Sequence, residues 1–269
     1  TLAALRQEVG IEQPAVLRYI VWLGGMLRGN IGTSITYGVP VAELIAARLL
    51  VTLPLAVLSI AMALLLALPL GIAAGARRDK PVDYGAMAFA QAAVSLPNCW
   101  IGLILILVFS TWLGWLPAGG FPGWQAGVTP AFGALVLPAL ALALPQAGVL
   151  ARVARTAVVE LSGDDFIRAA RAKGLPPRLI LWRHIVPNTV VPIITIIGLQ
   201  FTFLIAGAVL VENVFSLPGL GRLAFQAVAQ RDIVVLQSVV LLLAALVIVV
   251  NFVVDLCYLL LDPRMRDRR

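Results

Sequence analysis

Between residues 84 and 151 this chain contains no Asp, Glu, Lys, Arg or His. Similar apolar runs cover Leu49–Ala76, Ile185–Val211 and Ile233–Leu261. A soluble domain carries about 25% charged residues, whereas this chain of 269 residues carries 12% and is 61% hydrophobic. A soluble fold of this size cannot bury so much apolar surface. The sequence therefore predicts an all-α, polytopic membrane protein.

Five runs are long enough to be spans, because a helix needs about 20 apolar residues to cross the hydrocarbon. The charge-free stretch holds two of them, Ala86–Leu116 and Phe132–Ala151. Pro97 is expected to kink the first, and Pro138 and Pro145 the second.

The basic side chains indicate the orientation of these spans. Most of the 20 Lys and Arg residues fall in segments 77–80, 152–184 and 264–269, which reach the same side of the membrane. The positive-inside rule assigns that side to the cytoplasm and predicts a cytoplasmic C-terminus. It also explains the formal charge of +7 better than a nucleic-acid partner does, so no such partner is expected.

This orientation leaves residues 1–48 outside. We predict that they form a periplasmic segment, in which Ala15–Leu27 is a helix lying on the outer interface. The transmembrane domain is expected to cover residues 49–266. A signal-anchor helix is expected to precede Thr1, which would give the intact subunit six spans with both ends inside.

The loop Arg152–His184 carries a complete set of helix signals around residues 164–174. Asp164 and Asp165 suit a helix N-terminus, with Ser162 available as a cap. Gly174 and two following prolines suit its end. A helix of that length is about 15 Å long and too short to cross a membrane. We expect a short cytoplasmic helix.

The side chains of this short helix favour docking into a groove of a partner protein. Phe166, Ala169 and Ala170 are expected to form a face of mostly small residues, with basic side chains beside it. The alternative is an ordinary solvated basic loop.

The sequence of this loop resembles a known family motif. Arg168-Ala169-Ala170-x-x-x-Gly174, followed by Pro187, resembles the EAA loop of ABC importer permeases, with Arg168 in place of the family's Glu. In that family the loop forms a coupling helix, which sits in a cleft of the cytoplasmic ATPase. The resemblance implies that the following residues couple to the ATPase: Asp165, Arg168, Ala169, Ala170, Lys173, Gly174 and Pro187.

Other phrases resemble the peptide and nickel branch of that family, and together they run from about residue 14 to 266. They are the GxxGxS-like stretch 29–34, the RLxxTL-like stretch 48–53, the ARAKG…RH phrase 170–184, the ENVFxxPGLG phrase 212–221, and the C-terminal NxxxDxxYxxxDPR phrase 251–264.

The resemblance implies a bacterial inner-membrane subunit with four kinds of partner: a homologous second permease, two ATPase subunits, a periplasmic or lipid-anchored substrate-binding protein, and membrane lipid. No GxxxxGK[ST] phrase occurs, so ATP and Mg are expected in the partner subunits, with no metal or cofactor in this chain. No catalytic residues are expected, because the single His lies in the cytoplasmic loop and no pair of intramembrane acids exists.

Di- or oligopeptides are the expected substrates, since the spans offer few His or carboxylate ligands for nickel. Import of nickel, glutathione or another small solute by the same architecture is the alternative. A membrane scaffold without ATP coupling is a remote one.

Two further groups of residues are candidates for the transport path. The first could form a periplasmic gate within loop 212–232, or only a helix connection: Glu212, Asn213, Phe215, Pro218, Gly219 and Gly221. The second is polar within the spans and could line the pathway or pair helices, with an anchoring role favoured for the acid: Gln146, Gln200, Asn251 and Asp255.

Overall fold

A computed structural model describes residues 14, 16, 17, 20, 24, 25, 28, 29 and 31–261, with side chains as far as residue 256. Within this part the chain is almost wholly helical, with one isolated antiparallel bridge between Thr33 and Pro40. Most of the interfacial helix expected at residues 15–27 lies outside the described residues, as does the phrase beyond Leu261.

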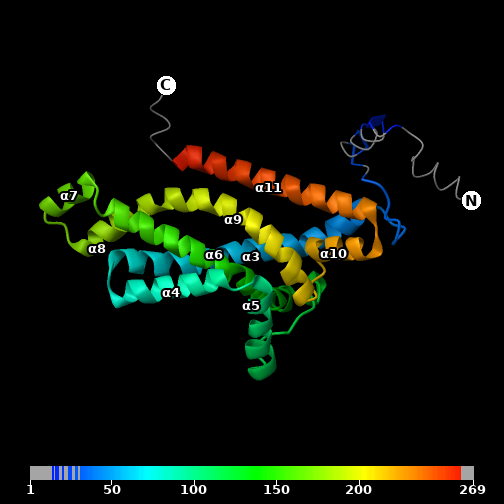
Figure 1. Cartoon of the computed structure of the whole chain (residues 1–269), viewed down its shortest axis with the longest axis horizontal. Helices are drawn as coiled ribbons and strands as arrows, with labels where there is room; N and C mark the ends of the chain where they lie inside the picture. Colours follow the sequence, from blue (N-terminus) through cyan, green and yellow to red (C-terminus); the bar gives the residue numbers. More distant parts are fainter. Residues whose placement is uncertain are drawn as a thin grey trace, which may run out of the picture.

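Four helices are long and apolar enough to cross a membrane. They are α3 (Val41–Ala76), α6 (Val128–Leu161), α9 (Val186–Val214, continuous with α8 and η3 from Pro177) and α11 (Ile233–Leu261). They lie side by side along the long axis of the molecule (Figure 1). The four corresponding predicted spans are confirmed, and α3 begins eight residues before the apolar run that predicted it.

The predicted span Ala86–Leu116 is not one straight helix. It consists of α4 (Pro81–Ser95) and α5 (Asn98–Leu105), the latter continued by the π-helix η1 (Ile106–Trp112), and the two parts meet at 104°. Pro97 favours an extended residue before it, and Leu96 has φ −96° and ψ 134°. The kink expected at Pro97 is therefore a break that sends α5 away from the bundle (Figure 1).

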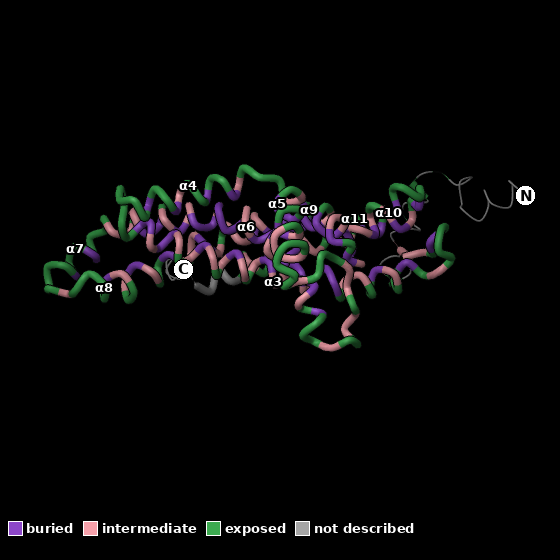
Figure 2. Tube along the Cα trace, turned by 90° about the horizontal axis from the view of Figure 1, so that it is seen from below, coloured by how far each residue is buried: buried purple, intermediate pink, exposed green. Residues whose placement is uncertain are grey.

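Helix α6 is the central helix of the bundle. In its most apolar stretch 72% of the residues are buried, against 17% in α11. Pro138 and Pro145 do not interrupt it. Figure 2 shows the buried positions concentrated along α6 and the helices beside it.

Small residues let α3 and α6 approach closely. A Cβ added to Gly71 would lie 2.5 Å from the Ala151 carbonyl oxygen, and one on Gly75 would lie 2.7 Å from the Val158 Cβ. Around these glycines the two helices pack mainly through alanines, among them Ala67 and Ala147. Lipid is as apolar as the helices, so no hydrophobic force drives helices together within a membrane. Close packing through small residues, as seen here, is what holds them side by side.

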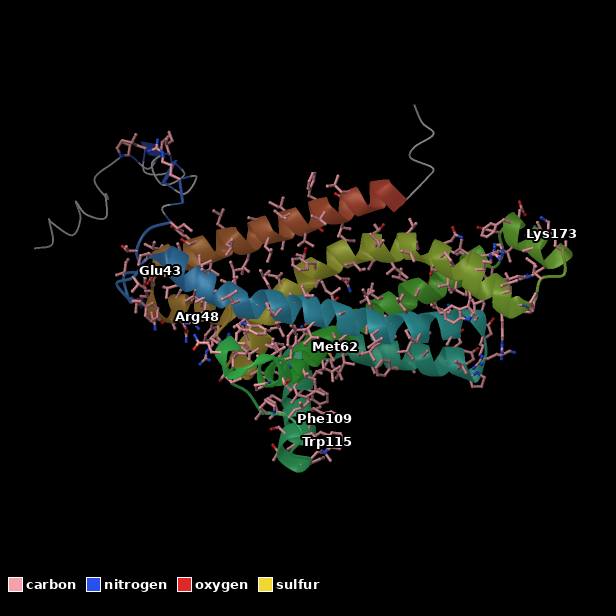
Figure 3. All side chains as sticks on the ribbon, turned by 180° about the vertical axis from the view of Figure 1, so that it is seen from behind. Glu43, Arg48, Met62, Phe109, Trp115 and Lys173 are labelled. Carbon is pink, nitrogen blue, oxygen red and sulfur yellow. The ribbon has the colours of Figure 1, made fainter. Side chains whose placement is uncertain are left out.

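Two groups of short elements lie at opposite ends of the long axis. At one end are α7 (Asp165–Ala172), α8 (Pro177–Ile180) and the π-helix η3 (Leu181–Ile185). At the other are α10 (Leu220–Gln230) and the turn 31–40, beside the start of α3. Figure 3 shows Lys173 at one end and Glu43 at the other. We call these the α7 end and the α10 end.

Candidate functional site

Helix α7 has the boundaries that its sequence signals predict. Asp164 precedes it in extended conformation (ψ 152°), and its carbonyl oxygen accepts hydrogen bonds from Ile167 and Arg168, both at 3.1 Å. Gly174 follows it with φ +75°, a conformation that glycine adopts without strain. The expected cap, Ser162, does not cap α7, because its hydroxyl donates to the Val158 carbonyl oxygen at 2.6 Å, at the end of α6.

The inner face of α7 packs on the ends of the spans. Ile167 is fully buried and Ala170 is 6% exposed. They belong to an apolar cluster with Ile72 of α3, Val158 of α6 and Ile185 of η3. We call this the α7 anchor cluster. The cluster joins helices from four parts of the chain and packs α7 on the ends of the spans.

The outer face of α7 carries Phe166, Ala169 and Lys173, and all three are exposed. Ala169 therefore lies where the docking prediction needs it. Ala170 does not, and the expectation that the two alanines share one docking face is wrong. The reason is the packing of α7 on the spans: Ile167 and Ala170, one turn apart, face the α7 anchor cluster, and Ala169, two residues after Ile167, points nearly the opposite way. Phe166 lies between these two sides and is 42% exposed.

The charged side chains of α7 make few bonds within the chain. Arg168 pairs with Asp165 at 3.3 Å, with both side chains highly exposed. Such a pair contributes little to stability. Arg171 donates to the Ser162 carbonyl oxygen at 3.3 Å. These charges are available to a partner.

Pro187 is exposed near the start of α9. A proline inside a helix clashes with the carbonyl four residues earlier. Here that carbonyl belongs to Arg183, which lies in the π-helical turn η3, where the helix is wider. Pro187 therefore does not interrupt the helix, which runs without a break from α8 through η3 into α9.

A buried ion pair next to this end escaped the sequence reasoning. Arg155 of α6 donates two hydrogen bonds to Asp83 of α4, at 2.6 and 2.7 Å, and Asp83 is 1% exposed. The backbone N–H of Asp79 also donates to Asp83. The one signal in the sequence was the position of Asp83, directly before the charge-free stretch 84–151. An acid at the edge of a span needs a partner, which predicts a nearby base but not which one. The pair fixes α4 against α6.

At the α10 end the predicted gate residue Glu212 is fully buried. One of its carboxyl oxygens accepts a hydrogen bond from the Thr52 hydroxyl at 2.7 Å, and the other accepts one from the backbone N–H of Arg222 at 3.0 Å. The Thr52 oxygen in turn accepts the N–H of Leu220 at 2.8 Å. We call Thr52, Glu212 and the N–H groups of Leu220 and Arg222 the Glu212 network. It joins α3, α9 and α10.

The other gate candidates surround this network. Gly219 and Gly221 are buried against it, and a Cβ on Gly219 would overlap the Glu212 carboxyl group. Phe215 is fully buried and packs on Gly102 of α5. Asn213 and Pro218 are half-buried. Most of these residues thus pack between helices, and a gate at this position stays a prediction.

A second buried acid braces the same end. The Asp232 carboxylate accepts hydrogen bonds from the Ser34 hydroxyl, from the backbone N–H of Thr36 at 3.1 Å, and from that of Val235 at 3.2 Å. Burial raises the pKa of Asp232, but these hydrogen bonds outweigh it and hold the pKa below its ordinary value of 3.8. Asp232 thus ties turn 31–40 to the start of α11.

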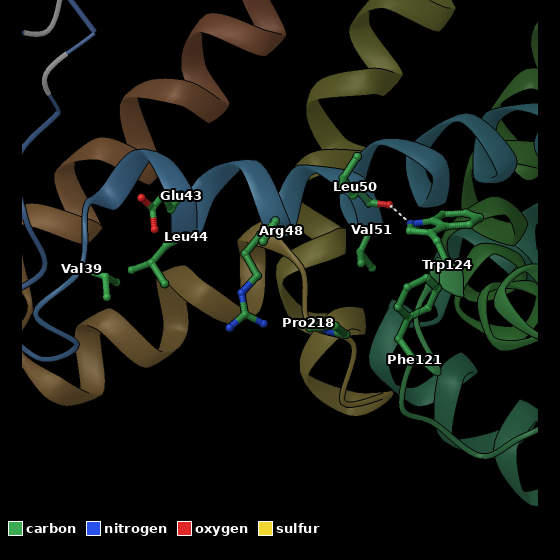
Figure 4. A pocket seen from close by; sticks show the side chains of 10 residues that line it. Val39, Glu43, Leu44, Arg48, Leu50, Val51, Phe121, Trp124 and Pro218 are labelled. Carbon is green, nitrogen blue, oxygen red and sulfur yellow. Dashed lines mark hydrogen bonds between the residues drawn. The ribbon is translucent and has the colours of Figure 1, made fainter. Parts of the chain in front are cut away.

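Pro218 also borders an open pocket of about 380 Å³. Glu43 and Arg48 of α3 line it, together with Phe121 and Trp124. Figure 4 shows Arg48 extending to the side of α3 on which Pro218 lies, and the Trp124 ring N–H donating to the Leu50 carbonyl oxygen at 2.9 Å. The pocket therefore presents one acid and one base on an apolar wall.

The four intramembrane candidates do not form one site. Gln146 and Gln200 line a very small cavity between α3, α6 and α9, and the Gln146 side-chain oxygen is buried without a partner. Asn251 packs against Gly198, where α11 approaches α9. Asp255 is exposed on α11, and the basic segment 264–269, whose Arg264 and Arg266 could pair with it, lies outside the described residues. Among the described residues no cluster of His, Cys, Asp and Glu could hold a metal.

Residues 67–267 match the family described as "Binding-protein-dependent transport system inner membrane component". The "Probable peptide ABC transporter permease protein y4tP" of Sinorhizobium fredii is 38% identical over 265 residues, which cover 98% of this chain and 85% of that protein. The "Glutathione transport system permease protein GsiC" of Salmonella typhi is 38% identical, covering 98% of this chain and 84% of that protein.

Among solved structures, the inward-facing MetNI methionine ABC transporter contains a similar chain, with a TM-score of 0.69. The similarity covers 82% of this chain and 97% of the other, at 19% sequence identity. At that identity the likeness establishes the fold alone.

Proposed function

Because this chain belongs to the binding-protein-dependent inner-membrane components of transport systems, we propose that it imports di- or oligopeptides and is driven by separate ATPase subunits through α7. The chain is a multi-pass inner-membrane permease subunit of an ABC importer. Its substrate and its contact with the ATPase are the proposal.

The exposed outer face of α7 carries the proposal for coupling. Phe166 offers an aromatic anchor that is 42% exposed, and Ala169 offers a flat surface beside it. Buried aromatic anchors with small neighbours are typical of interface hot spots. Lys173 on this face and Arg168 beside it suit an acidic rim on the partner.

The α7 anchor cluster explains how motion would pass into the spans. ATP and Mg are bound by the partner ATPases, whose closure pulls the coupling helices together. Since Ile167 and Ala170 pack on the ends of α3, α6 and η3, a displacement of α7 rotates these helices as a rigid body. Gln146 of α6 and Gln200 of α9 lie along the helices that would move, and Asn251 of α11 packs on one of them at Gly198.

A homologous second permease would cover the arm formed by α5 and η1. This arm is bent by 104° from α4 and exposes large apolar side chains, namely Trp100, Leu103, Leu107 and Trp112. The arm and the outward sides of α11 supply apolar surface for that partner and for membrane lipid. The α7 end and the C-terminus would be cytoplasmic, as the basic segments indicate.

Peptides fit the open pocket at the α10 end. A zwitterionic peptide carries one positive and one negative end, and Glu43 and Arg48 are one acid and one base on the same wall. Neither side chain forms an ion pair or hydrogen bond with another described residue. The names of the relatives from S. fredii and Salmonella support a peptide, since glutathione is itself a tripeptide. Nickel import is less well supported, and a substrate-binding protein would deliver the ligand to this end.

The test uses the full transporter, co-expressed with its partner subunits and reconstituted with its binding protein. Ala169→Glu is expected to release the ATPase subunits during purification and to abolish ATP-dependent uptake of labelled peptides. Glu43→Gln is the control for assembly, since Glu43 lies at the other end of the molecule. Retention of the ATPases by Ala169→Glu would refute the α7 contact. Uptake of nickel alone would refute a peptide substrate, and uptake of glutathione but of no other di- or oligopeptide would narrow it to the glutathione alternative.

A further inference from the structure

The α7 end contains a basic pocket that the coupling function leaves unused. It measures about 440 Å³ and lies between the end of α3, the end of α6, the inner flank of α7, and α8 with η3. Arg77, Arg171 and Arg178 line it, and no acidic residue does. Trp182, which is 63% exposed, forms part of its wall.

The three guanidinium groups are not neutralised within the described chain. Arg77 and Arg178 have no side-chain hydrogen bond or ion pair with another described residue, and Arg171 bonds only to a carbonyl oxygen. Of the nearby acids, Asp79, Asp83 and Asp165 pair with other arginines, namely Arg78, Arg155 and Arg168. Glu160 and Asp164 are exposed and do not line the pocket. A pocket with several free arginines and no acid attracts an anion.

The pocket lies where lipid headgroups lie. Arg77 is the first charged residue after the apolar run Leu49–Ala76, and Arg178 and Trp182 come shortly before the run Ile185–Val211. Two spans therefore reach the edge of the hydrocarbon at this pocket. Tryptophan favours that level of a bilayer, and arginine there pairs with phosphate.

The remaining walls suit the apolar part of a lipid. Leu175, Leu181 and Ile185 line the pocket beside the arginines. Arginine binds phosphate through a planar fork of N–H donors. A phosphodiester at the guanidinium groups would place its glycerol and acyl chains against the leucines.

We propose that this pocket binds the headgroup of an anionic phospholipid and so fastens the base of α7 to the membrane surface. The alternative occupant, an acidic segment of the ATPase, is disfavoured by geometry, because Phe166 and Ala169 face away from the pocket while Arg171 borders it. The inference rests on the membrane placement of the chain and not on its substrate or its contact with the ATPase.

The test compares two triple variants of the full transporter, co-expressed with its partner subunits. The pocket variant is Arg77→Gln, Arg171→Gln and Arg178→Gln. The matched control removes the same charge on the same side but outside the pocket: Arg78→Gln, Lys80→Gln and Arg183→Gln. Phosphatidylglycerol bound per transporter is measured by native mass spectrometry, after purification from vesicles of equal parts phosphatidylcholine and phosphatidylglycerol.

The pocket variant is expected to bind phosphatidylglycerol on the order of a hundredfold more weakly than the wild type, as three lost arginine contacts imply. The control is expected to bind as the wild type does, and both variants are expected to keep their ATPases. Replacing the three arginines with lysines, which keeps the charge but removes the fork, is expected to weaken binding less.

Three results would overturn the proposal. Equal losses in the two triple variants would mean that diffuse surface charge holds the lipid. Displacement of phosphatidylglycerol by inorganic phosphate at equal concentration would mean that the ligand is the free anion. Loss of the ATPase subunits with lipid retained would mean that the pocket belongs to the ATPase interface, while a failure of Ala169→Glu alone would leave the lipid proposal standing.

Discussion

The two ends of the molecule use their polar residues in opposite ways. At the α10 end Glu212 and Asp232 are buried, and each accepts hydrogen bonds from groups distant in the sequence. At the α7 end the polar side chains of α7 itself are exposed and the contacts that α7 buries are apolar, although the buried Asp83–Arg155 pair joins α4 to α6 nearby. Both ends carry phrases that resemble the same family. A family motif of this kind can therefore contain residues that hold helices of the same chain together, or residues exposed for contact with a partner. Whether the residues are buried or exposed distinguishes the two cases.

The largest effect is expected at the α7 end when a charge is placed on the wrong face of α7. Ala170→Glu would bury an unpaired carboxylate in the α7 anchor cluster and lower the free energy of unfolding by about 4 kcal/mol. Ala169→Glu changes the exposed face, and we expect its effect on stability to be below about 0.5 kcal/mol. The measurement is reversible unfolding in detergent. Equal effects of the two variants would show that Ala170 is not on an inner face.

The next effect concerns the Glu212 network. Glu212→Ala would leave the Thr52 hydroxyl and the Arg222 N–H without their acceptor, at a cost of about 1–3 kcal/mol for each unsatisfied buried group. We expect a loss of about 3 kcal/mol in unfolding free energy and faster proteolysis between α9 and α10. Glu43→Ala is the matched control, because Glu43 is exposed at the same end. A Glu212→Ala transporter as stable as this control would favour a gating role over the brace.

The comparison also shows what local sequence could and could not predict. The spans and the bounds of α7 follow from apolar length and from Asp164 and Gly174, which act on their near neighbours. The inward position of Ala170 depends on where the ends of α3 and α6 lie, and no local pattern records that. The Asp83–Arg155 pair joins residues 72 positions apart and carries no spacing signal. The burial of Glu212 could not be predicted from local sequence either, because its hydrogen-bond partner Thr52 lies on a different span.

The two ends can also be compared through the cost in unfolding free energy of one substitution, glycine to alanine, made at each end in turn. Gly219→Ala would drive a Cβ into the Glu212 carboxyl group, which its hydrogen bonds hold in place, and is expected to cost about 2–3 kcal/mol. Gly174 has φ +75° but open space around it, so Gly174→Ala is expected to cost about 1 kcal/mol from backbone strain. Unfolding of both variants is measured in the wild-type and Glu212→Ala backgrounds.

In the Glu212→Ala background the cost of Gly219→Ala is expected to fall below about 1 kcal/mol, because the clash has lost its partner. The cost of Gly174→Ala should not change, since it lies at the other end. If Gly219→Ala costs the same in both backgrounds, the glycine is required for another reason and the Glu212 network does not explain it.

The smallest effect should appear as a pH dependence confined to the α10 end. The folded pKa of Asp232 lies below its ordinary value of 3.8, so the folded chain holds this proton less tightly than the unfolded chain. Its contribution to stability is then complete above pH 3.8 and is lost as the pH falls through the folded pKa. We expect the unfolding temperature of the wild type to fall more between pH 6 and pH 3 than that of Asp232→Asn.

Asp165→Asn is the control at the α7 end, where the carboxylate is 96% exposed and its ion pair is screened. That variant should keep the wild-type pH dependence, because removing an exposed acid leaves the buried brace intact. An Asp232→Asn variant with the same acid sensitivity as the wild type would mean that turn 31–40 and α11 are held together by packing, and that the contrast between the two ends is carried by Glu212 alone.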